Sequence, residues 1–417
     1  MTIETAPHIL MIGTVWPEPN SSAAGSRTVQ LIEQFQNRAW KITFACAAAE
    51  SPFSIDFTKY GIDKVSIALN SSDFDEFIKQ LQPTVVLFDR FMIEEQFGWR
   101  VAENCPDALR VLDTIDLHCL RLARQQAFKG KREFVPQDIL ETDVAKREIA
   151  SIYRCDMTLM ISQFEMQLLE QFFKIDPAIL HYTPFLLESI SEAHIKQWPA
   201  YDERKHFVTI GNFLHEPNWN GVLYLKEEIW PLIRKHMPDA ELHVYGAYAS
   251  PKVNQLHNPK EGFLIKGRAG SAQEIMLKAR VCLAPLRFGA GMKGKLIDAM
   301  ECGTPSVTTT IGAEAMHDHL EWGGVITDNV NDFASESIKL YHDKTTWMKA
   351  QTNGVEIINQ VFDKTKHAAL LFAKLAEVQK HKNTHRQQNF MGAVLLHHTI
   401  SGTKYMSRWI EEKNKHK

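Results

Sequence analysis

The hydrophobic positions of this chain gather in short runs that do not alternate with polar positions, and amphipathic stretches separate them. In the first half the runs cover residues 8–16, 40–49, 65–69, 85–89, 109–114, 157–162 and 179–185. Such runs are typical of strands buried on both faces of a parallel sheet. The intervening stretches, such as RTVQLIEQFQ and FEMQLLEQFF, have helical periodicity. The alternation predicts a doubly wound, Rossmann-like α/β domain over residues 1–190.

A second α/β pattern begins after a polar break. The stretch SEAHIKQWPAYDERKH contains a proline and predicts a linker over residues 191–205. Beyond it we expect a helix over 218–235 and strands at 206–213, 241–247, 262–267, 281–286, 306–310 and 324–328. The pattern therefore predicts a second Rossmann-like domain over 206–362, followed by helices over 363–417. A cleft between two such domains is a preferred place for a ligand.

Composition and charge narrow the class of protein. The 417 residues are 44% hydrophobic and 23% charged, which is ordinary for a protein with two or three packed domains. The net charge of −3 argues against a dedicated nucleic-acid binder. The six cysteines are scattered without a CxxC pair, which favours a reduced, cytoplasmic protein. We see no signal peptide or spanning segment, and contact with the inner face of a membrane stays open.

The stretch RFGAGMKGKLIDAM, residues 287–300, joins an apolar run to a helical pattern. It places Gly289, Gly291 and Gly294 beside Lys293 and Lys295. Glycines allow a ligand to approach the backbone, and the start of a helix binds anions. The stretch matches neither the Walker pattern nor GxGxxG. The alternative is a glycine-rich connector with solvated lysines.

These residues carry a resemblance to a known family. The segments IGNFLHEPNWNGVLYLKEEIWPLI, GFLIKGR and VCLAPLRFGAGMKGKLIDAMECGTPSVTTTIGAEAM resemble the C-terminal domain of group 1, family-4 retaining glycosyltransferases, which have the GT-B fold. The resemblance is strong over 206–316 and weaker over the N-terminal half. It implies two Rossmann-like domains facing across a cleft, with C-terminal helices that cross back to the first domain. It also implies a UDP- or GDP-linked sugar as donor substrate, with no bound cofactor and no metal.

The resemblance assigns most donor contacts to the glycine-rich stretch. It implies that the diphosphate contacts the backbone from Gly291 to Leu296 and that the ribose contacts Asp298. The residues implied at the nucleotide-sugar are Gly211, Arg268, Arg287, Gly289, Gly291, Met292, Lys293, Gly294, Lys295, Leu296 and Asp298. For Arg268 a surface position is the competing interpretation. His215, which follows Gly211, either faces the donor or is an ordinary loop histidine.

One position departs from the family's signature of two glutamates separated by seven residues. Asp298 stands at the second position, and the first falls on Ala290. The carboxylate expected beside the donor sugar is therefore missing. The departure leaves open a non-catalytic, nucleotide-sugar-binding scaffold, or a GT-B epimerase, as alternatives to a transferase.

In the N-terminal half, the turn after the first strand carries Gly25, Ser26 and Arg27, which the resemblance places on the acceptor side of the cleft. Ser26 either contacts the acceptor or caps the helix, and Arg27 is a candidate for a phosphate contact. Asp116 and His118 follow the strand at 109–114 and are the candidate catalytic residues, because histidine exchanges protons near neutral pH. An aspartate cap beside a helix histidine is the alternative.

Two further expectations concern local structure and partners. Ser162 and Glu165 have the spacing of a capping box at a helix start. For the whole chain we expect a saccharide or lipid-linked saccharide acceptor, no nucleic-acid partner, and a role in bacterial polysaccharide or glycoconjugate synthesis.

Overall fold

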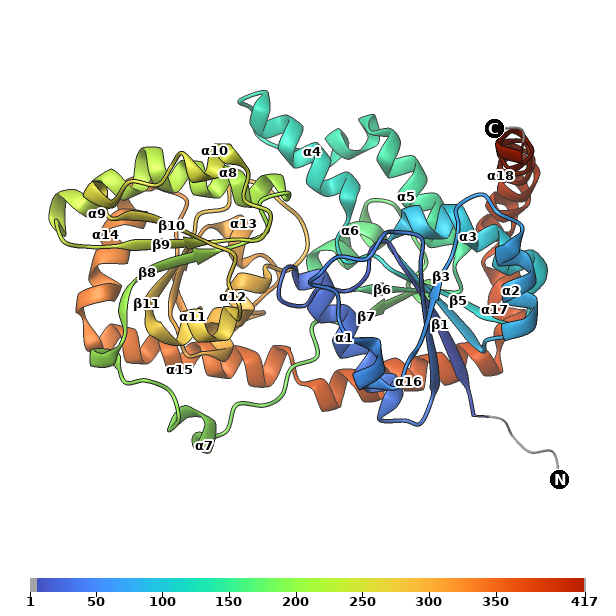
Figure 1. The fold of residues 1–417 in the computed structure, drawn as a ribbon, viewed down its shortest axis with the longest axis horizontal. Coiled ribbons are helices and arrows are strands. Elements are labelled where there is room, and N and C mark those ends of the chain that lie inside the picture. The colour runs from blue at the N-terminus through green and yellow to red at the C-terminus, as the bar shows by residue number, and fades with distance from the viewer. Residues whose placement is uncertain (1–5, 416–417) are drawn as a thin grey trace.

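The computed structural model describes residues 6–415, which fold into two α/β lobes (Figure 1). The N lobe is built on a seven-stranded sheet in the order β3-β2-β1-β4-β5-β6-β7, with every pair of neighbours parallel. Its strands are β1 His8–Gly13, β2 Lys41–Cys46, β3 Asp63–Ser66, β4 Val85–Asp89, β5 Leu109–Asp113, β6 Met157–Met160 and β7 Leu180–Tyr182. Each expected strand of the first half is present.

The C lobe is built on a six-stranded parallel sheet in the order β10-β9-β8-β11-β12-β13. Its strands are β8 Lys205–Ile210, β9 Leu242–Tyr245, β10 Phe263–Gly267, β11 Ala279–Ala284, β12 Ser306–Thr308 and β13 Gly324–Ile326. Both sheets run outward from their first strand in two directions, which is the strand order of the Rossmann fold. The predicted pair of doubly wound domains, the GT-B arrangement, is confirmed.

Helices cover both faces of the first sheet. They are α1 Ala23–Gln36, α2 Asp73–Leu81, α3 Phe91–Asn104, α4 His118–Lys129, α5 Asp143–Arg154 and α6 Gln163–Gln171, with single turns η1 Phe57–Tyr60, η2 Pro136–Glu141 and η3 Pro177–Ile179. Side-chain caps fix several of their starts: Ser22 accepts from the Gly25 amide at α1, and Thr142 accepts from the Ala145 amide at α5.

The linker and the C lobe contain further helices. They are α7 Glu192–Ile195, η4 Tyr201–Glu203, α8 Glu216–Tyr224, η5 Leu225–Ile229, α9 Trp230–His236, α10 Pro251–Asn254, η6 Pro259–Glu261, α11 Ala272–Lys278, α12 Gly294–Glu301, α13 Thr310–Ala313, α14 Val330–His342 and α15 Lys344–Val361. The helix expected over 218–235 is interrupted by the π-helical turn η5. Pro231 follows this turn, and because proline has no amide hydrogen it cannot continue the regular α-helical bonding.

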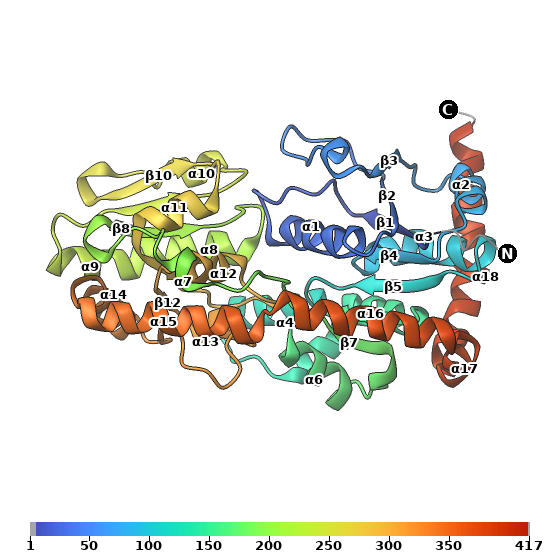
Figure 2. The ribbon, with the colours of Figure 1, turned by 90° about the horizontal axis from the view of Figure 1, so that it is seen from below.

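The C-terminal helices are α16 Lys364–Lys380, α17 Lys382–Gln388 and α18 Phe390–Lys415. In Figure 2, α15 runs along the C lobe and α16 continues from it across the N lobe. Leu371, Leu375 and Val378 of α16 are buried in one apolar cluster with residues of β1, β2 and β4. The tail of the chain therefore braces the lobe in which the chain began.

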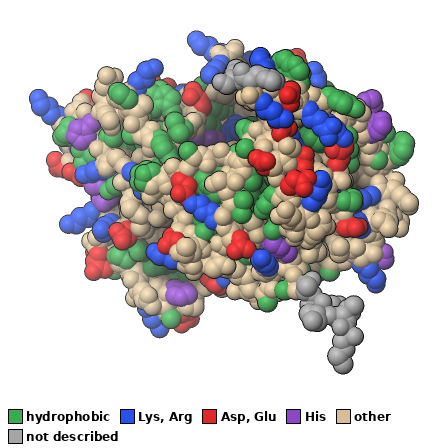
Figure 3. All heavy atoms as spheres, turned by 45° about the vertical axis from the view of Figure 1, so that its right-hand side comes forward, with side chains coloured by type: hydrophobic (Ala, Val, Ile, Leu, Met, Phe, Trp, Pro, Cys, Tyr) green, Lys and Arg blue, Asp and Glu red, His purple; other side chains and the backbone are tan. Residues whose placement is uncertain are grey.

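The surface fits the near-neutral composition. On the face drawn in Figure 3, acidic and basic side chains lie interspersed, in keeping with the net charge of −3.

Candidate active site

A cavity of about 730 Å³ lies between the two lobes. Its walls come from segments that follow β1, β5, β8, β10 and β11, which are the carboxyl ends of the strands of both sheets. Ligands of open α/β sheets bind at this edge, and the volume suits a small molecule.

The glycine-rich residues 289–295, called the donor loop below, form one wall of the cavity. Gly289 and Gly291 have φ of +151° and +63°, in the region that favours glycine. A Cβ atom on Gly291 would lie 2.7 Å from the Cβ atom of Asp116, and one on Gly294 would lie 2.7 Å from that of Ala23. The glycines therefore also allow the N lobe to approach the loop closely.

Some backbone amides of the donor loop make hydrogen bonds within the protein, and others make none. Gly291 donates to the Glu165 carboxylate, and Leu296 donates to the carbonyl of Lys293. The amides of residues 292–295 donate to no other residue within 6–415. Unused amides at the start of a helix form an anion site. The expected diphosphate contacts therefore narrow to 292–295, without the amides of Gly291 and Leu296.

The two lysines of the donor loop have different partners. Lys293 Nζ donates to the carbonyl oxygens of Ala290 and Gly291, so it holds the loop from within. Lys295 Nζ donates to Asn218 Oδ1 at 2.9 Å. Burial lowers the pKa of Lys295 to about 8. Both lysines line the cavity and supply positive charge to the wall beside the free amides.

Two carboxylates, Asp298 and Glu301, lie one turn apart on the same face of α12 and line the cavity. Neither side chain accepts a hydrogen bond from a described residue. Burial raises the pKa of each to about 7, and the charge of Asp298 adds to the effect on Glu301. The sequence pointed to Asp298 but missed Glu301, although the i,i+3 spacing was a signal for it.

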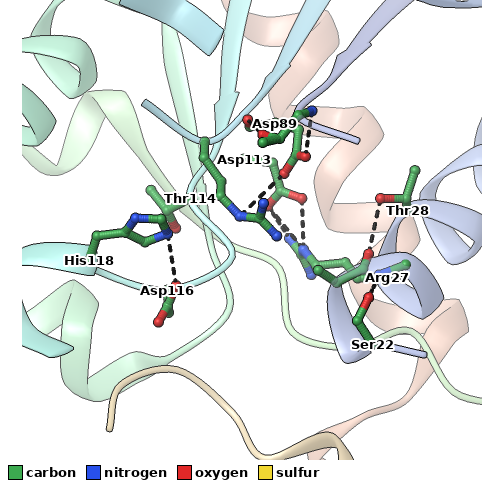
Figure 4. A network of polar contacts seen from close by, with 12 residues as sticks. Ser22, Arg27, Thr28, Asp89, Asp113, Thr114, Asp116 and His118 are labelled. Carbon is green, nitrogen blue, oxygen red and sulfur yellow. Dashed lines mark hydrogen bonds and ion pairs between the residues drawn. The ribbon is translucent and has the colours of Figure 1, made fainter. Parts of the chain in front are cut away.

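The predicted catalytic residues come from the N lobe, and Asp116 lies directly against the donor loop. His118 Nε2 is 3.3 Å from Asp116 Oδ1 (Figure 4). Arg121 donates to the other oxygen of Asp116. Burial opposes ionisation of Asp116, but the charge of Arg121 and the His118 contact outweigh it and hold its pKa well below the usual range. Phe91 packs edge-on against the His118 ring, with 5.5 Å between ring centroids. Both candidates line the cavity with their side chains held in place.

His215 and Gly211 also line the cavity, from the turn after β8. Burial lowers the pKa of His215 to about 4, and the nearby charge of Arg121 acts in the same direction. The imidazole is therefore neutral at physiological pH and adds no positive charge for a phosphate. A Cβ atom on Gly211 would lie 2.7 Å from the side chain of Asn218, so the turn packs tightly on α8.

Two of the three expected acceptor-side residues lie outside the cavity. Arg27 is 1% exposed and forms an ion pair with Asp113 (Figure 4). It also donates to the carbonyls of Thr183 and Pro184 at 2.7 and 3.0 Å. It is therefore unavailable to a ligand. Gly25 packs against the backbone of Glu18. Ser26 does line the cavity, and the cap of α1 is Ser22.

Three of the expected donor residues also lie away from the cavity. Arg268 donates to Ser21 at 2.8 Å and stacks over the Phe53 ring. Arg287 donates to Asn220 at 2.9 Å and stacks on aromatic rings. The side chain of Leu296 is fully buried in the core. Their expected contacts with a donor are replaced by contacts within the protein.

The expected capping box at α6 does not form. Ser162 Oγ accepts from the Glu165 amide at 3.3 Å, so Ser162 is the cap. The Glu165 carboxylate points elsewhere and accepts from the amides of Leu117, at 3.2 Å, and of Gly291 in the C lobe, at 2.5 Å. Sequence reasoning did not indicate this contact between the lobes.

Comparisons with known proteins agree with this fold. Residues 204–343 match the family described as "Glycosyl transferases group 1". Sucrose-phosphate synthase from Thermosynechococcus elongatus superposes with a TM-score of 0.66 at 15% identity, over 89% of this chain and 99% of that one. A glycosyltransferase from Rickettsia africae gives 0.65 at 11%, over 90% and 99%. Anabaena HepE, in complex with UDP and glucose, gives 0.63 at 13%, over 88% and 99%. No curated protein matches the sequence significantly.

The family match and the fold together define the class. Residues 204–343 match the group 1 glycosyltransferase family, and the chain as a whole has the GT-B fold, as the sequence resemblance predicted. The predicted function, transfer of a sugar from a nucleotide-sugar donor, is confirmed at the level of this class.

Residues 6–415 contain neither a metal site nor a membrane-spanning helix. No group of three or more His, Cys, Asp or Glu side chains there is arranged to hold a metal ion. Over the same residues, no helix combines the length and the apolar character that a membrane crossing requires.

Proposed function

We propose that this chain is a retaining hexosyltransferase that uses a UDP- or GDP-linked sugar and binds it in the cavity between the lobes. The observation that carries the proposal is that unused amides and two carboxylates lie along one face of α12. Its first turn presents unused amides, and its next turns present Asp298 and Glu301 without protein partners. A nucleoside diphosphate has the matching order of groups, with phosphates followed by a ribose diol.

In this site the diphosphate binds the amides of residues 292–295, with the charge of Lys295 beside it. Asp298 accepts hydrogen bonds from the ribose hydroxyls. When the bond between the sugar and the diphosphate breaks, negative charge grows on the leaving oxygen. Preorganised amides and a helix N-terminus stabilise that charge, which is a large term in catalysis. The UDP complex of HepE, a protein with this fold, supports the choice of ligand.

The acceptor hydroxyl enters from the N lobe. His118 lines the cavity, and Asp116 orients its ring, so His118 is placed to accept a hydrogen bond from the hydroxyl and then its proton. The bond from the sugar carbon to the diphosphate oxygen breaks, and the acceptor oxygen bonds to that carbon on the same face. Retention of configuration follows from the family resemblance.

A second candidate function is favoured by one observation, the alanine at position 290. A chain without the signature carboxylate beside the donor sugar is a candidate for a scaffold that binds a nucleotide-sugar without turnover. Both functions share the donor site and differ at the chemical step.

We further propose that the acceptor is a lipid-linked saccharide and that α18 contacts the inner face of a membrane. This helix exposes Phe390, Met391, Val394, Tyr405, Met406 and Trp409. Lys413 lies over the Trp409 ring, so a basic group accompanies the apolar face, as in helices that lie on anionic lipid. Trp409→Ser should reduce co-sedimentation with anionic vesicles. Equal sedimentation of the variant and the wild type would remove this part of the proposal.

The transfer reaction is tested by turnover. The protein is incubated with UDP- and GDP-linked hexoses, and release of the nucleoside diphosphate is followed with and without candidate acceptors. We expect release with one donor, and a loss of about 10²-fold or more in His118→Ala, the usual contribution of a general base. Donor binding without release from any donor would favour the scaffold.

A further inference from the structure

The donor loop is held by two side chains of the N lobe, one on each side of Ala290. Arg124 Nη1 donates to the Gly289 carbonyl at 2.9 Å. The Gly291 amide donates to Glu165 Oε1 at 2.5 Å. The position that lacks the signature carboxylate is therefore flanked by polar contacts that cross between the lobes.

Arg124 is fixed by more than this one contact. Its guanidinium binds both oxygens of Glu314, in the C lobe, at 2.8 and 2.7 Å. It also lies over the rings of Phe134 and Phe164. A two-point contact between arginine and a carboxylate is strong and directional. One α4 side chain thus joins two separate places on the C lobe.

Glu165 joins the donor loop to the turn that carries the catalytic candidates. Its side chain is fully buried, and its second oxygen accepts from the Leu117 amide at 3.2 Å. Leu117 lies between Asp116 and His118, so one carboxylate contacts both walls of the cavity. A buried carboxylate is costly without hydrogen-bond partners, and here one partner comes from each lobe.

Apolar packing accompanies these polar contacts. Ala290 belongs to the same buried cluster as Leu117 and Leu120 of the N lobe. Phe128 of α4 packs against Phe288, with 5.1 Å between ring centroids. Separation of the lobes would expose this packing, leave the Gly291 amide without its acceptor and bring Glu165 into water.

We propose that Arg124 and Glu165 are positioning residues that set the backbone of the donor loop from across the lobe interface. Nucleotide-sugar binding then depends on closure of the lobes, because the free amides at 292–295 are aligned only while both contacts are made. The inference rests on the proposed donor site. Neither side chain lines the cavity, so both act through the loop and neither touches the donor.

The contacts of Arg124 and Glu165 with the donor loop are tested without any ligand, by hydrogen–deuterium exchange of the peptide covering residues 288–296. The variants are Arg124→Lys, Glu165→Gln and Glu314→Gln. The matched control is Arg147→Lys, which disturbs a similar two-point pair with Glu95 on the N-lobe surface. We expect faster exchange of this peptide in the three variants and wild-type exchange in the control. Unchanged exchange in Arg124→Lys and Glu165→Gln would overturn the inference, whatever the protein's function.

The positioning role is tested by donor binding and kinetics in the same variants. We expect the donor Kd and KM to rise about tenfold or more, the loss typical of one hydrogen bond to a charged group. We expect kcat at saturating donor to fall less than donor affinity, because bound donor favours the closed lobes, with unchanged kinetics in Arg147→Lys. Faster exchange with unchanged donor affinity would refute the positioning role. A wild-type protein that binds no nucleotide-sugar would refute the proposed donor site together with that role, while the exchange data still decide whether the contact exists.

Discussion

At the residue scale, the buried groups around the donor loop make donor binding depend on pH. Burial raises the pKa of Asp298 to about 7 and lowers that of Lys295 to about 8. In the proposed site Asp298 accepts both ribose hydroxyls only when it is ionised, so we expect affinity to fall as pH drops below about 7. Lys295 loses its charge as pH rises above about 8, so affinity for the diphosphate falls there too.

The expected result is a bell-shaped profile of donor affinity against pH, measured by calorimetry with a nucleotide-sugar whose phosphates do not titrate in this range. In Asp298→Asn, the loss of donor affinity at low pH should become smaller, because only Glu301 then contributes to it. A flat profile between about pH 6 and 9 would show that these groups do not meet the donor.

The sequence located some of these residues because they follow strands. Asp116 and His118 come directly after β5, and Lys295 and Asp298 begin the helix after β11. Arg27 carried the same signal and was misplaced, because its partner Asp113 lies 86 residues away and nothing local indicates that pair. Glu165 was misread for a similar reason: its acceptor role at Gly291 spans 126 residues. Local spacing finds the edge of a sheet, but it does not show which charged side chains pair across the fold.

At the scale of elements, the apolar runs located every strand because parallel strands are buried on both faces. Helix continuity was harder to predict, as the π-helical turn at Leu225–Ile229 shows. The position of α16 also lay beyond pattern reasoning. The amphipathic sequence of α16 indicates a helix, but only the fold shows that its apolar side packs against the N lobe.

The bracing role of α16 gives a prediction about stability. Leu375 is 4% exposed in the N-lobe cluster, whereas Leu370 on the same helix is 49% exposed. Leu375→Ala should lower the free energy of unfolding by about 2–5 kcal/mol, because it removes buried apolar contacts and leaves a cavity. Leu370→Ala should change it by less than about 0.5 kcal/mol. Denaturant unfolding of both variants checks the pair, and equal effects would contradict the bracing role.

At the scale of the whole molecule, two lobes of the same fold contribute different parts of one site. The C lobe supplies amides and carboxylates on α12, and the N lobe supplies His118, Asp116 and the two contacts that hold the donor loop. The domain limits at 190, 205 and 362 stay predictions, although the tail that follows them packs on the N lobe. Under the proposed function, the donor binds between the lobes, and we expect its affinity to depend on residues of both.

The measurement that tests this account most directly is calorimetric titration of the wild type, Asp298→Ala and the surface control Asp143→Ala with UDP- and GDP-linked sugars. Asp143 is 89% exposed on the N lobe, far from the donor loop in the sequence. The account predicts saturable binding of one nucleotide-sugar by the wild type and the control, weakened about tenfold or more in Asp298→Ala. Equal affinity in all three proteins, or no binding by the wild type at millimolar donor, would contradict it.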